Sequence, residues 1–337
     1  MTTPGRIVCF GELLIRLSAP GHALLLQTPS LDVHVGGAEA NVAIGLANLG
    51  HATAMVSAVP DTALGRGARA AVRAQGVDTS GVSSRPGRMG LYFLSPGAGL
   101  RASEIVYDRE HSSFATASTA DFDWPTLLDG ASRLHLSGIT PALGPEPARM
   151  ALAAAEAATA AGVPVSFDGN YRARLWEAWD SDPRRILTAL VSHADMLFGN
   201  HQDVALLLGK EFSGDGADRR RAAAEAAFAA FPRLQLIAST ARQVVAADDH
   251  RIAARIDTRS DAAQTDAIAV TGIVDRIGAG DAFAAGVLHG LTTGDIHHAA
   301  RIGLALAALK HSLPGDASLF GPADLAAFLG GGLDVRR

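Results

Sequence analysis

The sequence has little cysteine and no excess of either charge. Its one cysteine, Cys9, cannot form an internal disulfide, and this favours a reducing compartment. Lysine and arginine number 29 against 34 acidic residues, which gives a formal net charge of -5. A chain with this balance lacks the basic surface that binds nucleic acid or an anionic membrane. We therefore expect neither of these partners.

Long apolar runs are also absent. A membrane-spanning helix needs ~18 or more apolar residues in succession, and even the alanine-rich segment 151–161 is interrupted by Glu156. The N-terminal residues place one arginine, Arg6, before a short apolar run, without the pattern of a cleavage site. We expect no targeting segment and a cytoplasmic location.

What the sequence does contain is an alternation of short apolar runs and helical runs. Its 337 residues, 48% of them hydrophobic, suffice for one large domain with a smaller attachment. Because apolar strands separated by helices form parallel sheets covered on both faces, the pattern predicts an α/β fold. Strands are expected at 7–10, 54–58, 133–136, 163–167, 196–198 and 234–238, and helices at 39–49, 63–75, 146–161, 183–193, 202–208 and 217–231.

Two stretches break the alternation. Residues 12–35 contain two prolines among scattered apolar residues, and residues 88–113 contain two further expected strands, 90–95 and 103–108. A β-rich excursion beside an α/β core is typical of a lid over a ligand site. The alternative is an ordinary surface hairpin.

The most informative segment is the turn Gly278-Ala279-Gly280-Asp281, which leads into a helix expected over 281–291. Bare backbone N–H groups at a helix start form a cradle for an anion. An aspartate beside such a cradle suits phosphoryl transfer, because Asp281 can take the proton of a hydroxyl while the amides stabilise the transferring group. The alternative is that Asp281 only caps the helix.

Two other segments offer groups for a small polar ligand. Paired glycines, Gly36 and Gly37, precede Asn41, whose amide can both donate to and accept from hydroxyls. Arg109 in the excursion and Arg172 after an expected strand offer planar forks for a carboxylate or a phosphate. The alternatives are a tight turn before a buried helix and two ordinary surface arginines.

Other functional classes lack their motifs. No G-x-x-x-x-G-K-[ST] segment is present, so a P-loop site is excluded. Residues 65–70 match a loose dinucleotide pattern, but no strand precedes them directly and Arg85 stands where an acid is needed. The twelve histidines show no metal-ligand spacing. We therefore exclude a nicotinamide enzyme and a zinc enzyme.

These segments occur in an order that resembles the ribokinase-like (PfkB) carbohydrate kinases, from residue 7 to about residue 314. The Gly-Ala-Gly-Asp turn is specific at the level of the family. Within the family the chain most resembles 2-keto-3-deoxygluconate kinases, on the segments 36–41, 107–109, 138–143, 170–176 and 308–311.

The resemblance implies a three-layer α/β/α sandwich over residues 1–330, with a mostly parallel central sheet and a small β lid from 12–35 and 88–113. It also implies a catalytic centre at Gly278, Ala279, Gly280 and Asp281. The implied substrate contacts are Gly37, Asn41, Tyr92, Tyr107, Arg109, Arg172 and Asp281. The implied nucleotide contacts are Asn170, Arg172, Asn200, Ser239, Gly278 and Gly280. Magnesium would be held through phosphates and water, with Asp203 near that water and no direct protein ligand.

The chain departs from the family at four places. Arg276 and Ile277 stand where a pair of threonines is common, and Asp203 stands for a glutamate that is one methylene longer. Segment 238–243 has no glycine where Lys-x-Gly-x-x-Gly is usual, and segment 299–310 has no asparagine for the adenine. The catalytic end therefore matches the family better than the purine end does.

The resemblance predicts ATP-dependent phosphorylation of a primary hydroxyl, O6 of 2-keto-3-deoxygluconate, with Mg²⁺. The alternatives are a kinase for 2-keto-3-deoxygalactonate, fructose or ribose, and a catalytically silent sugar-binding regulator. Because an exposed β lid has free edges, we also expect a homo-oligomer, a dimer through the lid.

Overall fold

The computed structural model describes residues 5–331, so residues 1–4 of the expected domain lie outside the described part. Its main sheet has ten strands in the described chain, in the order β13-β12-β11-β10-β9-β8-β1-β4-β5 with β14 beside β12. All neighbours from β11 to β5 are parallel, and β12, β13 and β14 are antiparallel additions. The strands are β1 (Arg6–Phe10), β4 (Thr53–Pro60), β5 (Val82–Arg85), β8 (Ala131–Ser137), β9 (Val165–Asp168), β10 (Met196–Phe198), β11 (Leu236–Ala246), β12 (Asp249–Thr258), β13 (Ala262–Gln264) and β14 (Ile268–Thr271).

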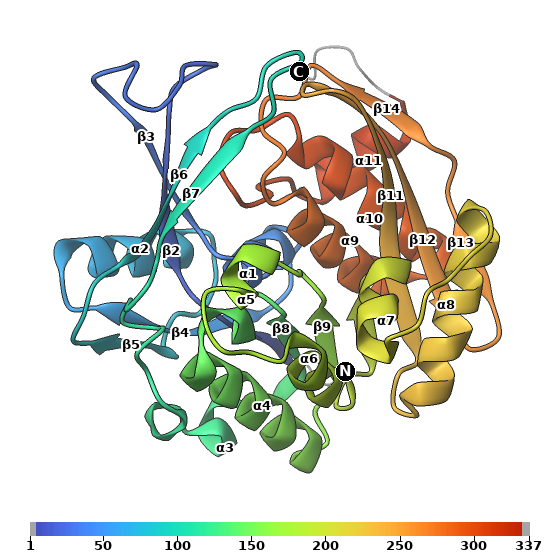
Figure 1. Cartoon of the computed structure of the whole chain (residues 1–337), viewed down its shortest axis with the longest axis horizontal. Coiled ribbons are helices and arrows are strands. Elements are labelled where there is room, and N and C mark those ends of the chain that lie inside the picture. The colour runs from blue at the N-terminus through green and yellow to red at the C-terminus, as the bar shows by residue number, and fades with distance from the viewer. Residues whose placement is uncertain (1–4, 332–337) are drawn as a thin grey trace.

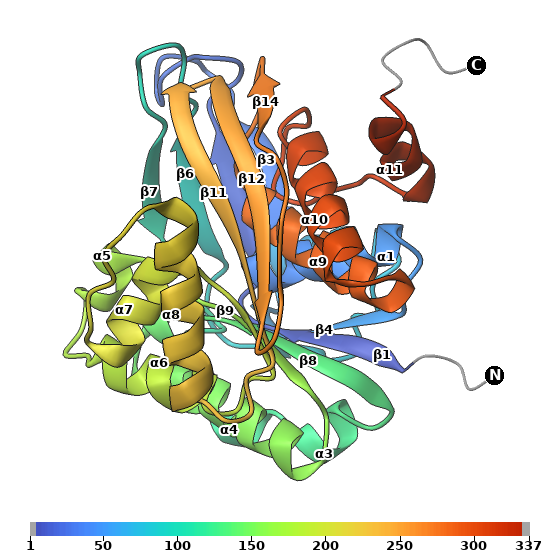
Figure 2. The same cartoon turned by 90° about the vertical axis from the view of Figure 1, so that its right-hand side faces the viewer.

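Helices cover both faces of this sheet, as predicted (Figures 1 and 2). The two hydrophobic cores lie on opposite faces of the sheet. In β1, Ile7 and Cys9 belong to one core, and the alternating residues Val8 and Phe10 belong to the other. One face carries α1 (Ala38–Asn48), α2 (Ala63–Ala74), α9 (Ala279–Thr293), α10 (Ile296–Lys310) and α11 (Pro322–Leu329). The other carries α3 (Trp124–Leu127), α4 (Pro145–Ala160), α5 (Ala173–Trp176), α6 (Pro183–Val191), α7 (His201–Leu208) and α8 (Gly216–Ala230).

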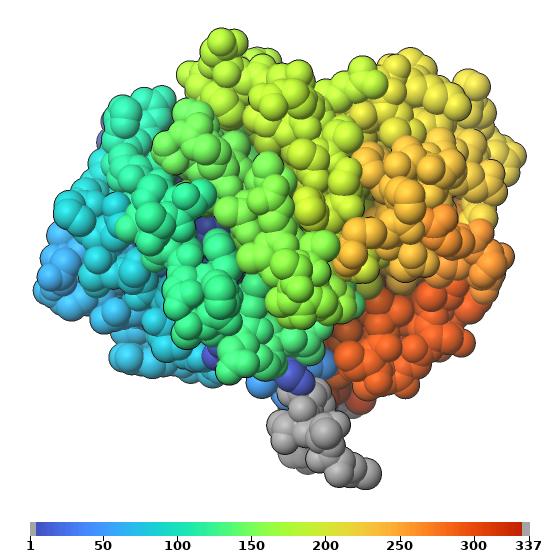
Figure 3. Space-filling model, turned by 90° about the horizontal axis from the view of Figure 1, so that it is seen from below, coloured from blue at the N-terminus to red at the C-terminus, as the bar shows by residue number. Residues whose placement is uncertain are grey.

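Seen from below, the surface follows the strand order of the sheet. In Figure 3 the blue and cyan N-terminal segments lie on one side, green segments lie in the middle, and orange and red segments lie on the other.

Cys9 is fully buried in this sheet, and burial raises the pKa of its thiol. It is therefore a small apolar core residue. No helix in the described part of the chain could cross a membrane.

The two irregular segments form one separate sheet, which we call the lid. It has four strands in the order β3-β2-β6-β7, which are β2 (Leu14–Ser18), β3 (Asp32–Gly36), β6 (Gly90–Ser95) and β7 (Glu104–Asp108). At its tip the carbonyl of Gly99 accepts a hydrogen bond of 2.8 Å from the Ala247 N–H, which lies in the turn between β11 and β12. Figure 1 shows these two hairpin tips meeting at the top of the molecule.

The expected strand 234–238 is only the beginning of a longer element. It becomes the eleven-residue β11, which pairs with β12 from Leu236 to Ala246. The sequence does not indicate this extension, because residues 239–246 are mostly polar or exposed and pair with a strand that the sequence analysis did not predict. The other expected elements lie within two residues of their predicted bounds.

Helices α9 and α10 approach closely because small residues line their contact. A Cβ on Gly286 of α9 would lie 2.8 Å from Cα of Gly303 and 2.9 Å from the carbonyl oxygen of Ile302 on α10. Both atoms belong to the backbone, so neither can turn aside. This contact fixes the helix that begins with the Gly-Ala-Gly turn.

We therefore expect Gly286→Ala to lower the free energy of unfolding. Overpacking costs about 1–3 kcal/mol, which exceeds the gain of about 1 kcal/mol from replacing glycine in a helix. Gly67→Ala in α2 is the matched control, since nothing lies within 4 Å of its added Cβ. That variant should gain about 0.5–1 kcal/mol. Urea denaturation measures both, and equal stability of the two variants would contradict the packing argument.

Candidate active site

A cavity of about 1080 Å³ lies between the lid and the carboxyl ends of the parallel strands. Its walls come from the lid, the start of α1, the segments after β9 and β10, the middle of β11 and the turn before α9. The structure brings every sequence-predicted site residue to this cavity: Gly37, Asn41, Tyr92, Tyr107, Arg109, Asn170, Arg172, Asn200, Asp203, Ser239, Gly278, Ala279, Gly280 and Asp281.

The predicted anion cradle is present at the start of α9. Gly278 is the N-cap and has a left-handed backbone with φ of 77°. A Cβ there would lie 1.6 Å from the carbonyl oxygen of Asp316, so only glycine fits. The N–H groups of Gly280 and Asp281 bond to no described residue. They are free to bind an anion.

The alternative role for Asp281, capping, is wrong. The helix begins at Ala279 instead of residue 281, and Gly278 holds the cap position. The side chain of Asp281 instead accepts a hydrogen bond of 2.7 Å from Nδ2 of Asn41. The buried Oδ1 of Asn41 has no partner in the described chain. The pair thus leaves one amide acceptor and one carboxylate oxygen for a ligand hydroxyl.

Burial raises the pKa of Asp281 to about 7. The Asn41 hydrogen bond and the charge of Arg172 lower it, whereas Glu39 raises it. Burial likewise raises the pKa of Asp168 to about 7, and the carboxylates of Asp281 and Asp203 add to that effect. Asp281 and Asp168 are therefore both poised to exchange protons near neutral pH, and together with Asp203, whose charge also acts on Asp168, they form the acidic wall of the cavity.

Glu39 fixes the start of α1 beside this cluster. Its side chain is fully buried, and Oε1 accepts hydrogen bonds from the Ser137 N–H, the Ser137 hydroxyl and the Thr140 hydroxyl. Burial raises the pKa of Glu39 to about 7. These contacts join α1 to the end of β8 and so position Asn41.

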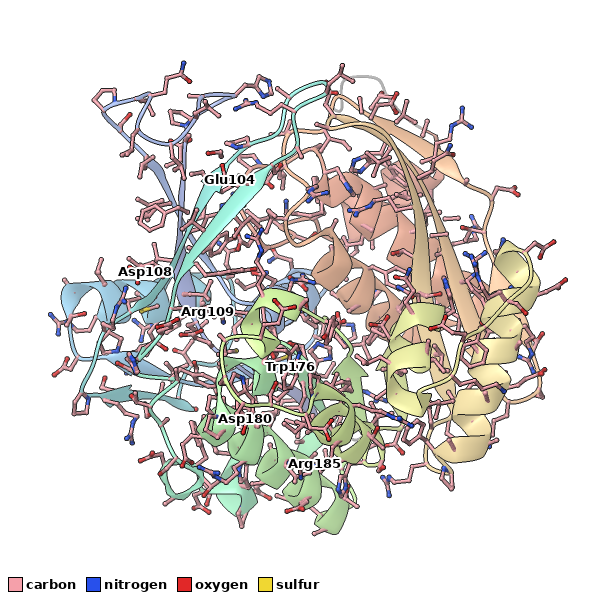
Figure 4. All side chains as sticks on the ribbon, viewed as in Figure 1. Glu104, Asp108, Arg109, Trp176, Asp180 and Arg185 are labelled. Atoms are coloured by element: carbon pink, nitrogen blue, oxygen red, sulfur yellow. The ribbon has the colours of Figure 1, made fainter. Side chains whose placement is uncertain are left out.

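The two predicted arginine forks differ in their partners. Arg109 is buried at the base of the lid, where Nε and Nη2 both donate to Oε2 of Glu12 at 2.8 and 2.5 Å. Figure 4 shows Glu104, Asp108 and Arg109 in order from the upper part of β7 to its base. Arg172 is exposed, and its Nη1 donates to the carbonyl of Tyr171. The guanidinium of Arg172 is therefore more available to a ligand than that of Arg109, which has mainly Nη1 left to donate.

Buried charges tie the lid to the cradle. Arg16 of β2 donates to Asp275 at 2.6 Å and pairs with Asp316 at 3.1 Å. The Tyr92 hydroxyl of β6 donates to Asp316 at 2.5 Å. The ammonium of Lys310, which is fully buried, donates to the Asp275 carbonyl at 3.4 Å and to the Leu313 carbonyl at 3.0 Å. The turn before α9 is therefore held from the lid and from the end of α10.

Sequence reasoning missed several of these groups. Glu12 and Asp168 each follow an apolar strand, and that position could have indicated them. Arg16 and Asp316 carry no comparable signal, because the partners of Arg16 lie more than 250 residues away along the chain.

The predicted nucleotide side lies after β9, β10 and in β11. Asn200 is the N-cap of α7, and the Asp203 side chain accepts a hydrogen bond of 2.7 Å from the Asn200 N–H. Asn170 has a positive φ of 35° and donates its N–H to Asp168. Ser239 is buried in β11. No three acidic, histidine or cysteine side chains among the described residues are grouped to hold a metal ion directly.

Comparison with known proteins agrees with this geometry. Residues 5–320 match the profile of the pfkB family carbohydrate kinases. The chain is 31% identical to the 2-dehydro-3-deoxygalactonokinase of Haloferax volcanii over 97% of both chains. It is 28% identical to the 2-dehydro-3-deoxygluconokinase of Bacillus subtilis, covering 92% of this chain and 90% of the relative. The crystal structure of 2-dehydro-3-deoxygluconokinase from Thermotoga maritima is 36% identical and superposes with a TM-score of 0.91, over 97% of this chain and 100% of that one.

Asp281→Asn should remove most of the turnover while substrate affinity stays within a few-fold. A general base contributes typically ~10²–10⁴ in rate, and asparagine keeps the shape but cannot take a proton. Steady-state kinetics with purified protein measure this. Retention of more than about a tenth of kcat would show that Asp281 is not the base.

The same residue should give kcat/KM an acidic limb. Only the ionised carboxylate can act as a base, and the pKa of Asp281 is raised to about 7. Activity should therefore be half-maximal near pH 7, level off above about pH 8, and fall about tenfold for each unit below about pH 6. A limb with its midpoint below pH 5, the range of an ordinary aspartate, would contradict this assignment.

Proposed function

Because the chain belongs to the pfkB family of carbohydrate kinases, we propose that it transfers a phosphoryl group from ATP to O6 of 2-keto-3-deoxygluconate. The broader activity, a phosphotransferase with an alcohol acceptor, follows from the family and its named relatives. The observation that carries the proposal is the joint placement of Asp281, the free amides of the cradle and two arginines around one cavity. The relative from Haloferax volcanii supports the galacto epimer as a second candidate substrate.

In this proposal each group of the site has one role. Asp281 accepts the proton of the sugar hydroxyl, while Asn41 orients both the carboxylate and a neighbouring hydroxyl. The N–H groups of Gly280 and Asp281 stabilise the charge on the transferring phosphoryl group. The lid, joined at its tip to the β11–β12 turn, keeps water from the reacting atoms.

The acidic wall fits a magnesium ion bound through phosphate and water. Asp168 and Asp203 line the cavity at the predicted nucleotide side, and the charges of Asp281 and Asp203 add to the effect of burial in raising the pKa of Asp168. A divalent cation would offset that repulsion, and the two carboxylates would orient its water ligands. We also propose that the protein works in the cytoplasm, in keeping with its one buried cysteine.

The arginines support a substrate that carries a carboxylate. A sugar acid pairs with a planar fork, whereas a neutral sugar leaves that fork desolvated and without a partner. Arg172 is the main candidate, and Arg109 adds the face that Glu12 leaves open. Fructose and ribose are thus the weaker candidates.

Phosphorylation of a panel of sugar acids and neutral sugars, measured by coupled ADP release, tests this assignment. The wild type should prefer the acid, and Arg109→Lys with Arg172→Ala should reduce the acid-to-fructose ratio of kcat/KM roughly ten- to 150-fold. Lysine is used at 109 because truncation would leave the buried Glu12 without its partner.

Arg88→Ala is the matched control, since this exposed lid arginine pairs with Asp108 outside the cavity. It should leave the ratio unchanged. An unchanged ratio in the double variant as well would refute carboxylate recognition. Absence of ADP release with every sugar would favour a silent sugar-binding regulator.

We propose further that two copies pair through their lids. The edge strands β3 and β7 present Val33, 63% exposed, and Val106, 47% exposed. The double change Val33→Lys, Val106→Lys should therefore convert a dimer to a monomer in sedimentation experiments. Leu64→Lys on α2, which alters an exposed leucine outside the lid, should remain dimeric. A monomeric wild type at working concentration would contradict pairing.

A further inference from the structure

Two arginines at the departures from the family pattern face the same cavity. Arg242 lies in β11, in the segment without glycine, and Arg276 lies two residues before the Gly278 cap. Both line the cavity together with Ser239 and the cradle. The proposed function has given them no role.

Neither guanidinium has a partner. No hydrogen bond or ion pair joins the side chain of Arg242 or of Arg276 to any described residue, whereas Arg16 and Arg109 are each held by a carboxylate. The two also act on one another, because burial and the charge of Arg276 both lower the pKa of Arg242. The same two charges lower the pKa of His250. Like charges without a counterion in one cavity are arranged for an anion.

We propose that Arg242 and Arg276 form a two-arginine site for the polyphosphate chain of the nucleotide. This inference rests on the proposed function, because it assigns the donor substrate's phosphates to named residues. Guanidinium forks match phosphate oxygens and carry charge that does not depend on pH.

Their position favours a polyphosphate over the carboxylate of the sugar. The lid follows β1 and flanks the sugar side, whereas β11 lies four strands away, beyond β8, β9 and β10. Asn200, at the end of β10, and Ser239, in β11, border the same region. Arg276 leads directly into the amides that receive the transferring group. A chain of phosphates running from the cradle toward β11 would pass both guanidinium groups.

Recognition through phosphate predicts that the enzyme does not discriminate strongly between nucleobases. The two forks contact only the part that all nucleoside triphosphates share, so they supply affinity where the glycine-rich purine segment is missing. Loss of either arginine should then weaken the binding of ATP and the binding of GTP by the same factor.

The test uses full-length Arg242→Gln and Arg276→Gln, with Arg251→Gln as control. Arg251 is an exposed arginine on β12, opposite Gln243, and does not line the cavity. Each cavity variant should raise the KM for ATP and for GTP at least tenfold, with the KM for the sugar within twofold and the control unchanged. A nucleotide KM within twofold of the wild type, or a rise in the KM for the sugar instead, would overturn the proposal.

A second measurement does not depend on turnover. Inorganic triphosphate should raise the Tm of the wild type and of Arg251→Gln, and should not raise that of either cavity variant. Without ligand, the variants should melt at or above the wild-type Tm, because the unpaired like charge is gone. Variants that melt lower, or that triphosphate still stabilises, would refute the site. If the wild type phosphorylates no sugar but triphosphate binding needs both arginines, the proposed function fails and this site stands.

Discussion

The buried charge cluster around Arg16 holds the active site together. Its guanidinium is 1% exposed and meets the carboxylates of Asp275 and Asp316, which come from the turn before α9 and the loop after α10. Gly278 packs against the backbone of Asp316, so the shape of the anion cradle depends on where that loop sits. Truncating one member of such a cluster leaves a buried charge without its partner, which typically costs about 3–5 kcal/mol. The position of the turn before α9 therefore depends on its ion pair with the lid.

A second constraint is the number of acids around the cavity. Glu39, Asp168 and Asp281 all have pKa values raised to about 7, chiefly by burial. Raised carboxyl pKa values mean that ionising these groups at neutral pH opposes folding. The fold tolerates this cost at the cavity, where an ionised Asp281 is the base that the proposed reaction requires.

The arginines in and beside the cavity differ in their partners. Carboxylates from the same chain pair with Arg16, which lies beside the cavity, and with Arg109, which lines it. Arg172, Arg242 and Arg276 have no acidic partner within hydrogen-bonding distance in the described chain. The cavity therefore holds guanidinium groups without an acidic partner as well as the carboxyl groups of Asp168, Asp203 and Asp281, which divides its charges into a cationic set and an acidic set. That division suits a reaction in which an anionic donor meets a hydroxyl beside a base.

Much of this arrangement could be predicted from the sequence because it depends on short-range order. Apolar runs predicted the strands of the parallel sheet, and the spacing within Gly278–Asp281 predicted the cradle, since four consecutive residues at a helix start set their own geometry. The lid segments were likewise visible as breaks in the helical pattern.

Tertiary structure decided what distant residues do to one another. In the folded chain β11 is extended by pairing with β12, and Arg109 forms an ion pair with Glu12. Arg242 lies close enough to Arg276 for the two charges to interact. Tertiary structure also showed that Gly278, and not Asp281, caps α9. The sequence by itself determined most strands of the parallel sheet, the lid segments and the Gly-Ala-Gly-Asp turn, because local spacing and hydrophobic pattern encode them, and its resemblance to a family indicated many other residues of the cavity. Only the folded chain determined which charges are paired and which remain open, because such pairs join residues as far apart in the chain as Arg16 and Asp316.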